Sequence, residues 1–205
     1  MSSSTTTTRT RKSPAERSAE IAAAATALAR EQGLGALTLR AVADRAGVAA
    51  SLIAHYQPSM DQLVADVYTT LVEEELQEVR LLLEGTDAAA PRFSMLLSTL
   101  LDGSREDLTV VWVEGWAMAR RNEALAGAVR AQMGQWHALV AGIAEDGNAQ
   151  GSFDAAEPAA VAWQLLGMID GLNAQSLVRD ADPAVTLVQM SRAAETLLGA
   201  RVGTL

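Results

Sequence analysis

Residues 38–63 read TLRAVADRAGVAASLIAHYQPSMDQL and contain two short helical patterns separated by a glycine. Thr38 can begin the first helix, because its hydroxyl can accept a hydrogen bond from an otherwise unpaired backbone N–H. Gly47 suits the turn that follows, since glycine adopts a left-handed conformation without a steric penalty. Pro58 ends the second helix, because proline cannot continue its backbone hydrogen bonding. Two short helices joined by a tight glycine turn predict a helix-turn-helix.

The flanking residues extend this motif to a unit of three helices. Ser13, Pro14 and Glu16 form a capping-box pattern with proline in the first turn, and the helix that they begin is expected to end near Gly33. The two short helices carry apolar residues that are spaced to face a common core, namely Leu39, Val42, Ala43, Leu52 and Ile53. We therefore expect a small packed head over residues 13–58.

The second helix of a helix-turn-helix lies in the major groove of DNA, so exposed residues of the head are candidate DNA contacts. Residues 1–60 carry a net charge of +3, whereas the remainder carries −12, for a total of −9. A basic head on an acidic body would orient the protein on DNA, because only the head attracts phosphates; a chance segregation of surface charge is the alternative. The candidate contacts are Thr38, Arg40, Ala49, Ala50, Ser51, Ala54, His55, Tyr56 and Met60.

Residues 19–63, AEIAAAATALAREQGLGALTLRAVADRAGVAASLIAHYQPSMDQL, resemble the DNA-binding domain of the TetR family of transcriptional regulators. Within them, LIAHYQPSMDQL is most similar to the branch typified by the choline-responsive repressor BetI. VVWVEGWAMARRNEALAGAVR (110–130) and FDAAEPAAVAWQLLGMIDGLNAQSLV (153–178) resemble the C-terminal domain of the same branch. Choline is not carried over as the effector, because residues of the pocket cannot be matched one by one.

Three positions depart from the family pattern in ways that concern DNA binding. Gln57 stands where an aromatic residue is common, Ala54 where many members have a tyrosine, and Met60 where a lysine usually contacts a phosphate. The backbone N–H groups near Met60 could still bind a phosphate at the start of a helix. Fewer phosphate contacts imply weaker binding, or reliance on residues 1–12, MSSSTTTTRTRK. That segment is predicted to be a disordered basic arm, which could also become ordered on DNA.

The rest of the chain predicts a helical body over residues 59–205 and hence an all-α fold. Ala, Leu, Glu and Arg are abundant, while the alternation typical of strands is sparse. Helix breaks are expected near Gly85, Pro91, Gly147, Gly151 and Pro158. Five to six helices are expected, near residues 59–84, 92–101, 105–120, 123–145, 155–178 and 183–198. The acidic residues Glu73, Glu74, Glu75 and Glu78 are predicted to form a solvated face.

The last two predicted helices carry apolar stripes that suit a homodimer interface. Helix-turn-helix proteins bind DNA as dimers, because two half-sites about one DNA turn apart require two heads. Gly167 and Gly171 lie on one face, where two helices could approach closely; packing within the protomer is the alternative. The candidate interface residues are Val161, Leu165, Gly167, Gly171, Leu187, Ser191 and Ala194.

The middle of the body is expected to hold a pocket for a small-molecule effector. Its candidate residues are Trp112, Glu114, Trp116, Trp136, Met168 and Asp170. Large apolar side chains more often fill a core than line a pocket, so an ordinary core is the alternative. A buried carboxylate needs a partner, which could be an arginine or a cationic ligand on a tryptophan face; exposure to solvent would remove that need. The set favours an aromatic or cationic effector.

Composition excludes several classes of protein. The absence of cysteine excludes disulfides and thiolate chemistry. His55 and His137 are the only histidines, and Gly-x-Ser-x-Gly, phosphate-binding glycine loops and paired metal-binding histidines do not occur. We therefore expect neither an enzyme nor a bound metal or cofactor. The chain has no run of about 18 apolar residues and no secretory pattern, so a cytoplasmic location is expected.

Together, the residues and the resemblance imply a ligand-responsive repressor. It would bind a palindromic operator as a homodimer and release it when a small molecule binds residues 59–205. Two alternatives stay open: a ligand-binding or scaffold protein with weak DNA affinity, suggested by Gln57 and Met60, and a regulator that responds to a protein partner.

Overall fold

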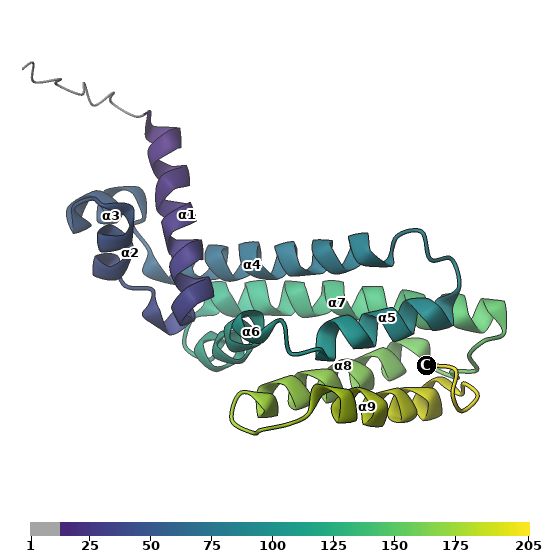
Figure 1. Ribbon diagram of the computed structural model, residues 1–205. Helices are drawn as coiled ribbons and strands as arrows, with labels where there is room; N and C mark the ends of the chain where they lie inside the picture. Colours follow the sequence, from purple (N-terminus) through teal and green to yellow (C-terminus); the bar gives the residue numbers. More distant parts are fainter. Residues whose placement is uncertain (1–12) are drawn as a thin grey trace, which may run out of the picture.

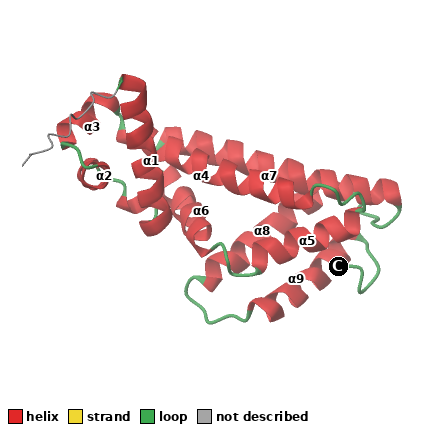
Figure 2. Ribbon diagram, turned by 45° about the horizontal axis from the view of Figure 1, so that its top comes forward, coloured by secondary structure: helices red, strands yellow, loops and turns green. Residues whose placement is uncertain are grey.

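A computed structural model describes residues 13–205, and every regular element in that range is helical. Figures 1 and 2 show a small head packed against one end of an elongated helical body. The head contains α1 (Pro14–Gln32), the 3₁₀ turn η1 (Leu34–Ala36), α2 (Leu39–Ala46) and α3 (Ala50–Tyr56). The body contains α4 (Met60–Leu83), α5 (Ala89–Leu101), α6 (Glu106–Ala119), α7 (Glu123–Gln150), α8 (Pro158–Ser176) and α9 (Pro183–Leu198). The predicted all-α fold is confirmed.

Local capping sets the helix boundaries of the head. The Ser13 Oγ accepts a hydrogen bond of 3.2 Å from the Glu16 N–H, and the Glu16 carboxylate accepts one of 2.7 Å from the Ser13 N–H. Thr38 caps α2 by accepting a hydrogen bond of 3.1 Å from the Ala41 N–H. Gly47 ends α2 in the left-handed conformation, with a φ of 65°. These contacts place α2 and α3 as a helix-turn-helix.

The core of the head differs from the prediction at two leucines. Val42, Ala43 and Ile53 are buried as predicted, but Leu39 is 36% exposed and Leu52 is only half-buried. Leu39 is the first residue of α2. Helical side chains lean toward the N-terminus, so the side chain of a first residue extends beyond the end of the helix.

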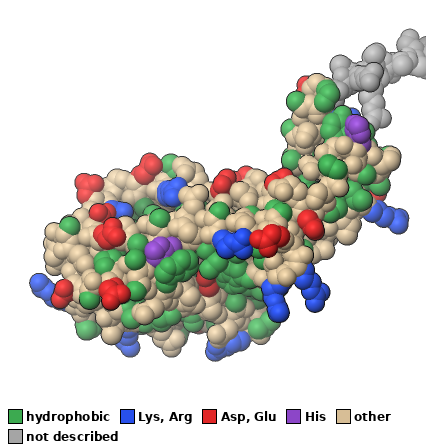
Figure 3. All heavy atoms as spheres, turned by 180° about the vertical axis from the view of Figure 1, so that it is seen from behind, with side chains coloured by type: hydrophobic (Ala, Val, Ile, Leu, Met, Phe, Trp, Pro, Cys, Tyr) green, Lys and Arg blue, Asp and Glu red, His purple; other side chains and the backbone are tan. Residues whose placement is uncertain are grey.

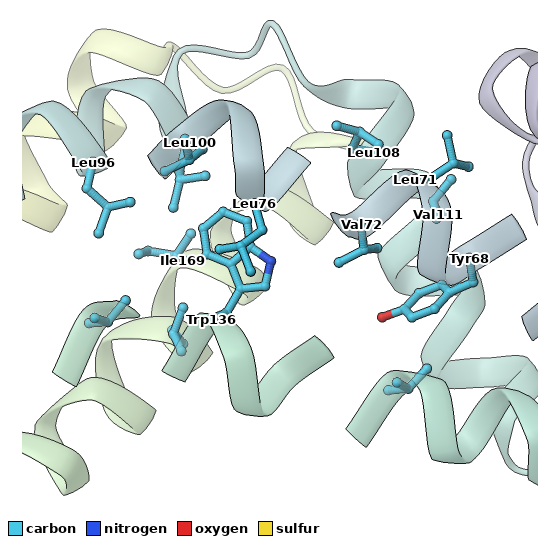
Figure 4. Close-up of a cluster of buried hydrophobic side chains, with 14 of the residues drawn as sticks. Tyr68, Leu71, Val72, Leu76, Leu96, Leu100, Leu108, Val111, Trp136 and Ile169 are labelled. Atoms are coloured by element: carbon cyan, nitrogen blue, oxygen red, sulfur yellow. The ribbon is translucent and has the colours of Figure 1, made fainter. Parts of the chain in front are cut away.

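The body is built around α4 and α7, which lie side by side in both ribbon views (Figures 1 and 2). Because α4 begins only four residues after α3 ends, the chain passes from the head directly into the centre of the body. Figure 4 shows part of the core, with Leu76 of α4 near Trp136 of α7 and Ile169 of α8, and with Tyr68 of α4 near Val111 of α6. Between residues 13 and 205, no helix combines the length and apolarity that crossing a membrane requires.

Helices α4 and α6 approach each other closely at a glycine. A Cβ atom on Gly115 of α6 would lie 2.6 Å from the Cε2 atom of Tyr68, whose side chain is fully buried. Real Cβ atoms do not approach other atoms this closely. The absence of a side chain at position 115 therefore makes room for the ring of Tyr68.

Three helices of the body have boundaries that differ from the prediction. Helix α7 continues to Gln150, and Gly147, which was expected to break it, lies inside the helix, where a Cβ atom would overlap the ring of Phe153. Helix α5 begins at Ala89, ahead of Pro91, because the first turn of a helix tolerates proline. Helix α8 is shorter than predicted at both ends and has a proline as its first residue.

Candidate DNA-binding surface and ligand cavity

The predicted DNA contacts lie at or near the surface of the head. The exposed ones are Thr38, Arg40, Ala49, Ala50, Ser51, Ala54 and His55. Tyr56 and Met60 are half-buried, and the ring of Tyr56 meets that of His55 edge-on, with centroids 5.2 Å apart. The surface therefore offers the hydroxyl of Ser51 and the imidazole of His55 on α3 as polar groups.

Most arginines of the described part of the head are engaged in ion pairs. Arg17 pairs with Glu20, Arg45 with Glu31, and Arg30 with residues of the body. The hydrogen bonds between Arg45 and Glu31 lower the pKa of that carboxyl and raise the pKa of the guanidinium. Arg40 is different: its side chain is 93% exposed and its Nε lies 3.9 Å from an Asp44 oxygen.

Arg40 is therefore the arginine of the described head that is most available to a phosphate. The basic residues of the predicted arm, Arg9, Arg11 and Lys12, lie outside the described residues.

A cavity of about 120 Å³ lies in the body between α4, α5, α6, α7 and α8. Four of the six predicted residues, Trp112, Trp116, Trp136 and Asp170, line it. Trp163, which was not predicted, makes a fourth tryptophan in the wall and is 46% exposed. It stacks on His137, with ring centroids 4.5 Å apart. Figure 3 shows hydrophobic side chains gathered beside a histidine on one face of the body.

Two carboxylates face this aromatic wall. Glu75 is only 5% exposed, and the Trp112 Nε1–H donates a hydrogen bond of 3.0 Å to it. Burial raises the pKa of Glu75, while Trp112 and Arg105 oppose that shift. Burial, with repulsion from Glu75, raises the pKa of Asp170 to about 6. Arg105 also lines the cavity but forms an ion pair of 3.1 Å with Glu78.

Several polar groups in this region lack partners. Within residues 13–205, neither Glu75 nor Asp170 forms an ion pair, and the buried Nε1 atoms of Trp116 and Trp136 have no hydrogen-bond acceptor. An unsatisfied buried donor costs about 1–3 kcal/mol. The carboxylates of Glu75 and Asp170 in the cavity wall can gain charge pairing from a bound molecule.

The prediction that Glu114 and Met168 line the cavity is not supported by their positions. Two residues along an α-helix are separated by about 200°, so Glu114 points away from Trp112 and Trp116. Its carboxylate instead accepts a hydrogen bond of 3.0 Å from the Gly35 N–H in the head. Met168 is separated from Asp170 in the same way and is exposed on the outer side of α8.

Glu75 was predicted to be solvated with its acidic neighbours, but helical spacing could have identified it as a buried residue. Residues 71, 75 and 79 recur every four positions, and both Leu71 and Val79 are fully buried. Glu75 therefore lies on the apolar face of α4. Glu74 and Glu78 lie outside this face and form ion pairs with Arg30 and Arg105.

The candidate dimer residues fall into two groups. Leu165 and Ala194 are fully buried within the protomer, so they cannot contact a partner directly. Val161, Leu187, Ser191 and Gly171 are half-buried, and Gly167 is exposed. The large apolar side chains exposed on α8 and α9 are Trp163, Met168, Val185 and Val188.

The family models match both parts of the chain. The model described as bacterial regulatory proteins of the tetR family matches residues 21–67, and the model of the C-terminal domain of BetI-type transcriptional repressors matches residues 89–202. No match was found among curated proteins.

Three solved structures illustrate the likeness in fold. A transcriptional regulator from Saccharomonospora viridis in complex with choline is 20% identical, with a TM-score of 0.78 over 88% of this chain and 96% of that chain. A transcriptional regulator from Rhodococcus sp. Rha1 is 24% identical, with a TM-score of 0.76 over 93% and 99%. A TetR transcription regulator from Haloarcula marismortui is 24% identical, with a TM-score of 0.74 over 90% and 97%. From the two family models, the chain belongs to the TetR family of transcriptional regulators and carries a BetI-type C-terminal domain.

Proposed function

We propose that this regulator is a repressor that binds operator DNA as a homodimer through α3 and releases it when a small organic cation enters the cavity of the body. The observation that carries the effector class is the meeting of four tryptophans and two carboxylates, Glu75 and Asp170, around one cavity. A cation on an indole face gains about 0.5–2 kcal/mol. A buried carboxylate without an ion pair is costly, and a bound cation would supply the opposite charge.

The size of the cavity suits a small molecule. Its volume of about 120 Å³ is slightly below the roughly 150 Å³ of an engineered apolar cavity that binds benzene. The Saccharomonospora viridis regulator holds choline, a cation with a hydroxyl, which makes choline a suitable first probe.

A homodimer fits the outer face of α8 and α9. Trp163, Met168, Val185 and Val188 leave apolar surface exposed there, and no protein atom comes within 4 Å of a Cβ placed on Gly167 or Gly171. A second copy could cover this surface and pack closely at the glycines. Leu165 and Ala194 would support the interface from inside the protomer.

The proposal is tested with the purified protein and a DNA fragment from the region upstream of its own gene. Choline is titrated while tryptophan emission is recorded, and DNA binding is followed by gel shift at a fixed salt concentration, since affinity depends on salt. The uncharged analogue 3,3-dimethylbutan-1-ol, which has nearly the same shape, is the matched control. We expect choline to change the emission and release the DNA, with a much weaker effect of the analogue.

Two results would contradict the proposal in different ways. Equal responses to choline and to its uncharged analogue would refute a cationic effector. Failure to bind DNA from this region, or from a selected pool of sequences, would favour the ligand-binding or scaffold alternative over a repressor.

A further inference from the structure

Helix α6 faces two different parts of the molecule. Trp112 and Trp116, four residues apart, lie in the cavity wall. Glu114, between them in sequence, lies on the opposite side, where its carboxylate accepts the hydrogen bond from the Gly35 N–H. One rigid helix thus contacts both the cavity and the segment that connects α1 to the helix-turn-helix.

The segment around Gly35 is shaped to receive this carboxylate. Gly33 has a φ of 81°, and a Cβ atom there would lie 2.6 Å from Oε2 of Glu114. Because glycine carries only a hydrogen where other residues have a Cβ atom, the carboxylate can approach the backbone at Gly33. A hydrogen bond to an ionised acceptor is about twice as strong as one between neutral groups.

Displacement of this segment would be passed on to α2. Leu34 and Leu37 on either side of Gly35 are buried in the core, and Thr38 caps α2 directly afterwards. The turn therefore cannot move independently of the start of α2. The core of the head, which includes Val42 and Ile53, joins α2 to α3.

The other polar contact between α6 and the head is longer. Arg30 of α1 and Asp107 of α6 are 3.5 Å apart, with side chains 40% and 35% exposed. The hydrogen bond from the Gly35 N–H to Glu114 is shorter, at 3.0 Å. Glu114 is thus the side chain of α6 with the more specific polar contact to the head.

We propose that Glu114 is a positioning residue that couples the cavity to the DNA-binding head. A ligand that separates the tryptophans moves α6, and the Glu114 carboxylate then displaces residues 33–37 together with α2 and α3. The effect on DNA requires that the ligand bind the displaced arrangement more tightly than the DNA-bound one. This inference rests on the proposed function for its ligand-dependent part, whereas the contact itself can be tested without a ligand.

The experiment compares Glu114→Ala with two other variants of the full-length protein. Glu114→Gln keeps an oxygen that can accept the hydrogen bond. Glu106→Ala is the matched control, because Glu106 is on the same helix and its side chain has no hydrogen bond or ion pair within residues 13–205. Each variant is measured for amide hydrogen exchange of residues 33–37, for choline binding by tryptophan emission, and for DNA affinity with and without choline.

We expect Glu114→Ala to accelerate exchange at the Gly35 amide and to bind choline within about threefold of the unmodified protein. The factor by which choline weakens DNA binding, typically about 5–150-fold for coupled sites, should fall below about twofold. Glu114→Gln should retain most of this factor, and Glu106→Ala all of it.

Two results would overturn the inference: unchanged exchange of residues 33–37 in Glu114→Ala, or a choline effect on its DNA binding as large as in the unmodified protein. If the unmodified protein binds DNA but does not respond to choline, the proposed effector class has failed. The exchange measurement, which needs no ligand, then decides whether Glu114 holds the head.

Discussion

The indole N–H of Trp112 donates a hydrogen bond of 3.0 Å to the carboxylate of Glu75, which joins α6 to α4 at the wall of the cavity. Both residues line the cavity, so a ligand that binds between the tryptophans also meets this hydrogen bond. Because α4 begins at the head, this hydrogen bond connects the cavity to the helix that leads to the DNA-binding head.

Replacement of Glu75 by Gln should weaken the binding of choline at least about tenfold, which corresponds to about 1.4 kcal/mol. The reason is the loss of a buried negative charge, while the amide keeps an oxygen for the Trp112 hydrogen bond. The measurement is a titration of tryptophan emission. Glu74→Gln, one position away on the exposed side, is the control and should have no effect; equal losses in both variants would mean that only the overall charge matters.

Choline binding should depend on pH through Asp170, whose pKa is about 6 in the empty protein. A cation prefers the ionised carboxylate, so the affinity at pH 5 should be about tenfold lower than at pH 7. Titrations across pH 5–8 measure this directly, and Asp170→Asn should flatten the dependence. A flat profile in the unmodified protein would show that Asp170 does not contact the ligand.

The same carboxyl should lower the stability of the empty protein at neutral pH. Its pKa in the folded state lies above the ordinary value of 3.8, so its favourable contribution is present below pH 3.8 and is lost as the pH rises through about 6. Asp170→Asn should therefore raise the unfolding temperature at pH 7 by several degrees, for a gain of up to about 3 kcal/mol. Asp180→Asn, at an exposed position, is the control in thermal unfolding, and a fall in the unfolding temperature of Asp170→Asn would contradict the assignment.

Arg40→Ala should weaken DNA binding without regard to sequence, because its exposed guanidinium is available to a phosphate. The slope of log affinity against log salt concentration should decrease by about 1. Arg201→Ala, at an exposed position far along the body, should leave the slope unchanged. An unchanged slope for Arg40→Ala would remove this residue from the DNA contacts.

Deletion of residues 1–12 should lower DNA affinity and reduce the salt dependence further, since three basic residues are removed. The unfolding temperature should stay the same, because a polar segment of this composition buries little apolar surface. Binding and thermal unfolding are measured on the same preparation. DNA affinity equal to that of the full chain at low salt would exclude a role for the arm.

Val188→Glu should convert the proposed homodimer to a monomer, because it places an unpaired charge in an apolar interface. Light scattering measures the mass, and DNA affinity should fall with it. Leu81→Glu, at an exposed apolar position on α4 instead of α8 or α9, should leave the dimer intact. A monomeric unmodified protein at micromolar concentration would refute the interface.

The head could be predicted in detail because its boundaries depend on local chemistry. The Thr38 cap, the left-handed Gly47 and the stop at Pro58 each act within a few residues. The Leu39 side chain was predicted wrongly because spacing alone does not show where a helix end projects beyond its neighbours.

The cavity was predicted in part, since the sequence shows which residues are large and aromatic but not which helix covers which face. Glu75 and Glu114 both occur among apolar residues in sequence, yet Glu75 faces the cavity and Glu114 faces the head. The angular position of each residue around its helix distinguishes Glu75 from Glu114 once the buried neighbours are known. Gly147 illustrates the same limit: its role is to admit Phe153, a contact that only the folded chain creates.

The close approach of Gly115 to Tyr68 limits how the body can deform. The ring of Tyr68 fills the place of a side chain at position 115, so α4 and α6 are closely packed against each other. Close-packed interiors transmit strain. Rotation of α6 about its own axis would therefore turn or shift α4 as well. A molecule that enters the cavity would therefore displace the head at two places, at Gly35 through α6 and at Met60 through α4. The head would then tilt relative to the body.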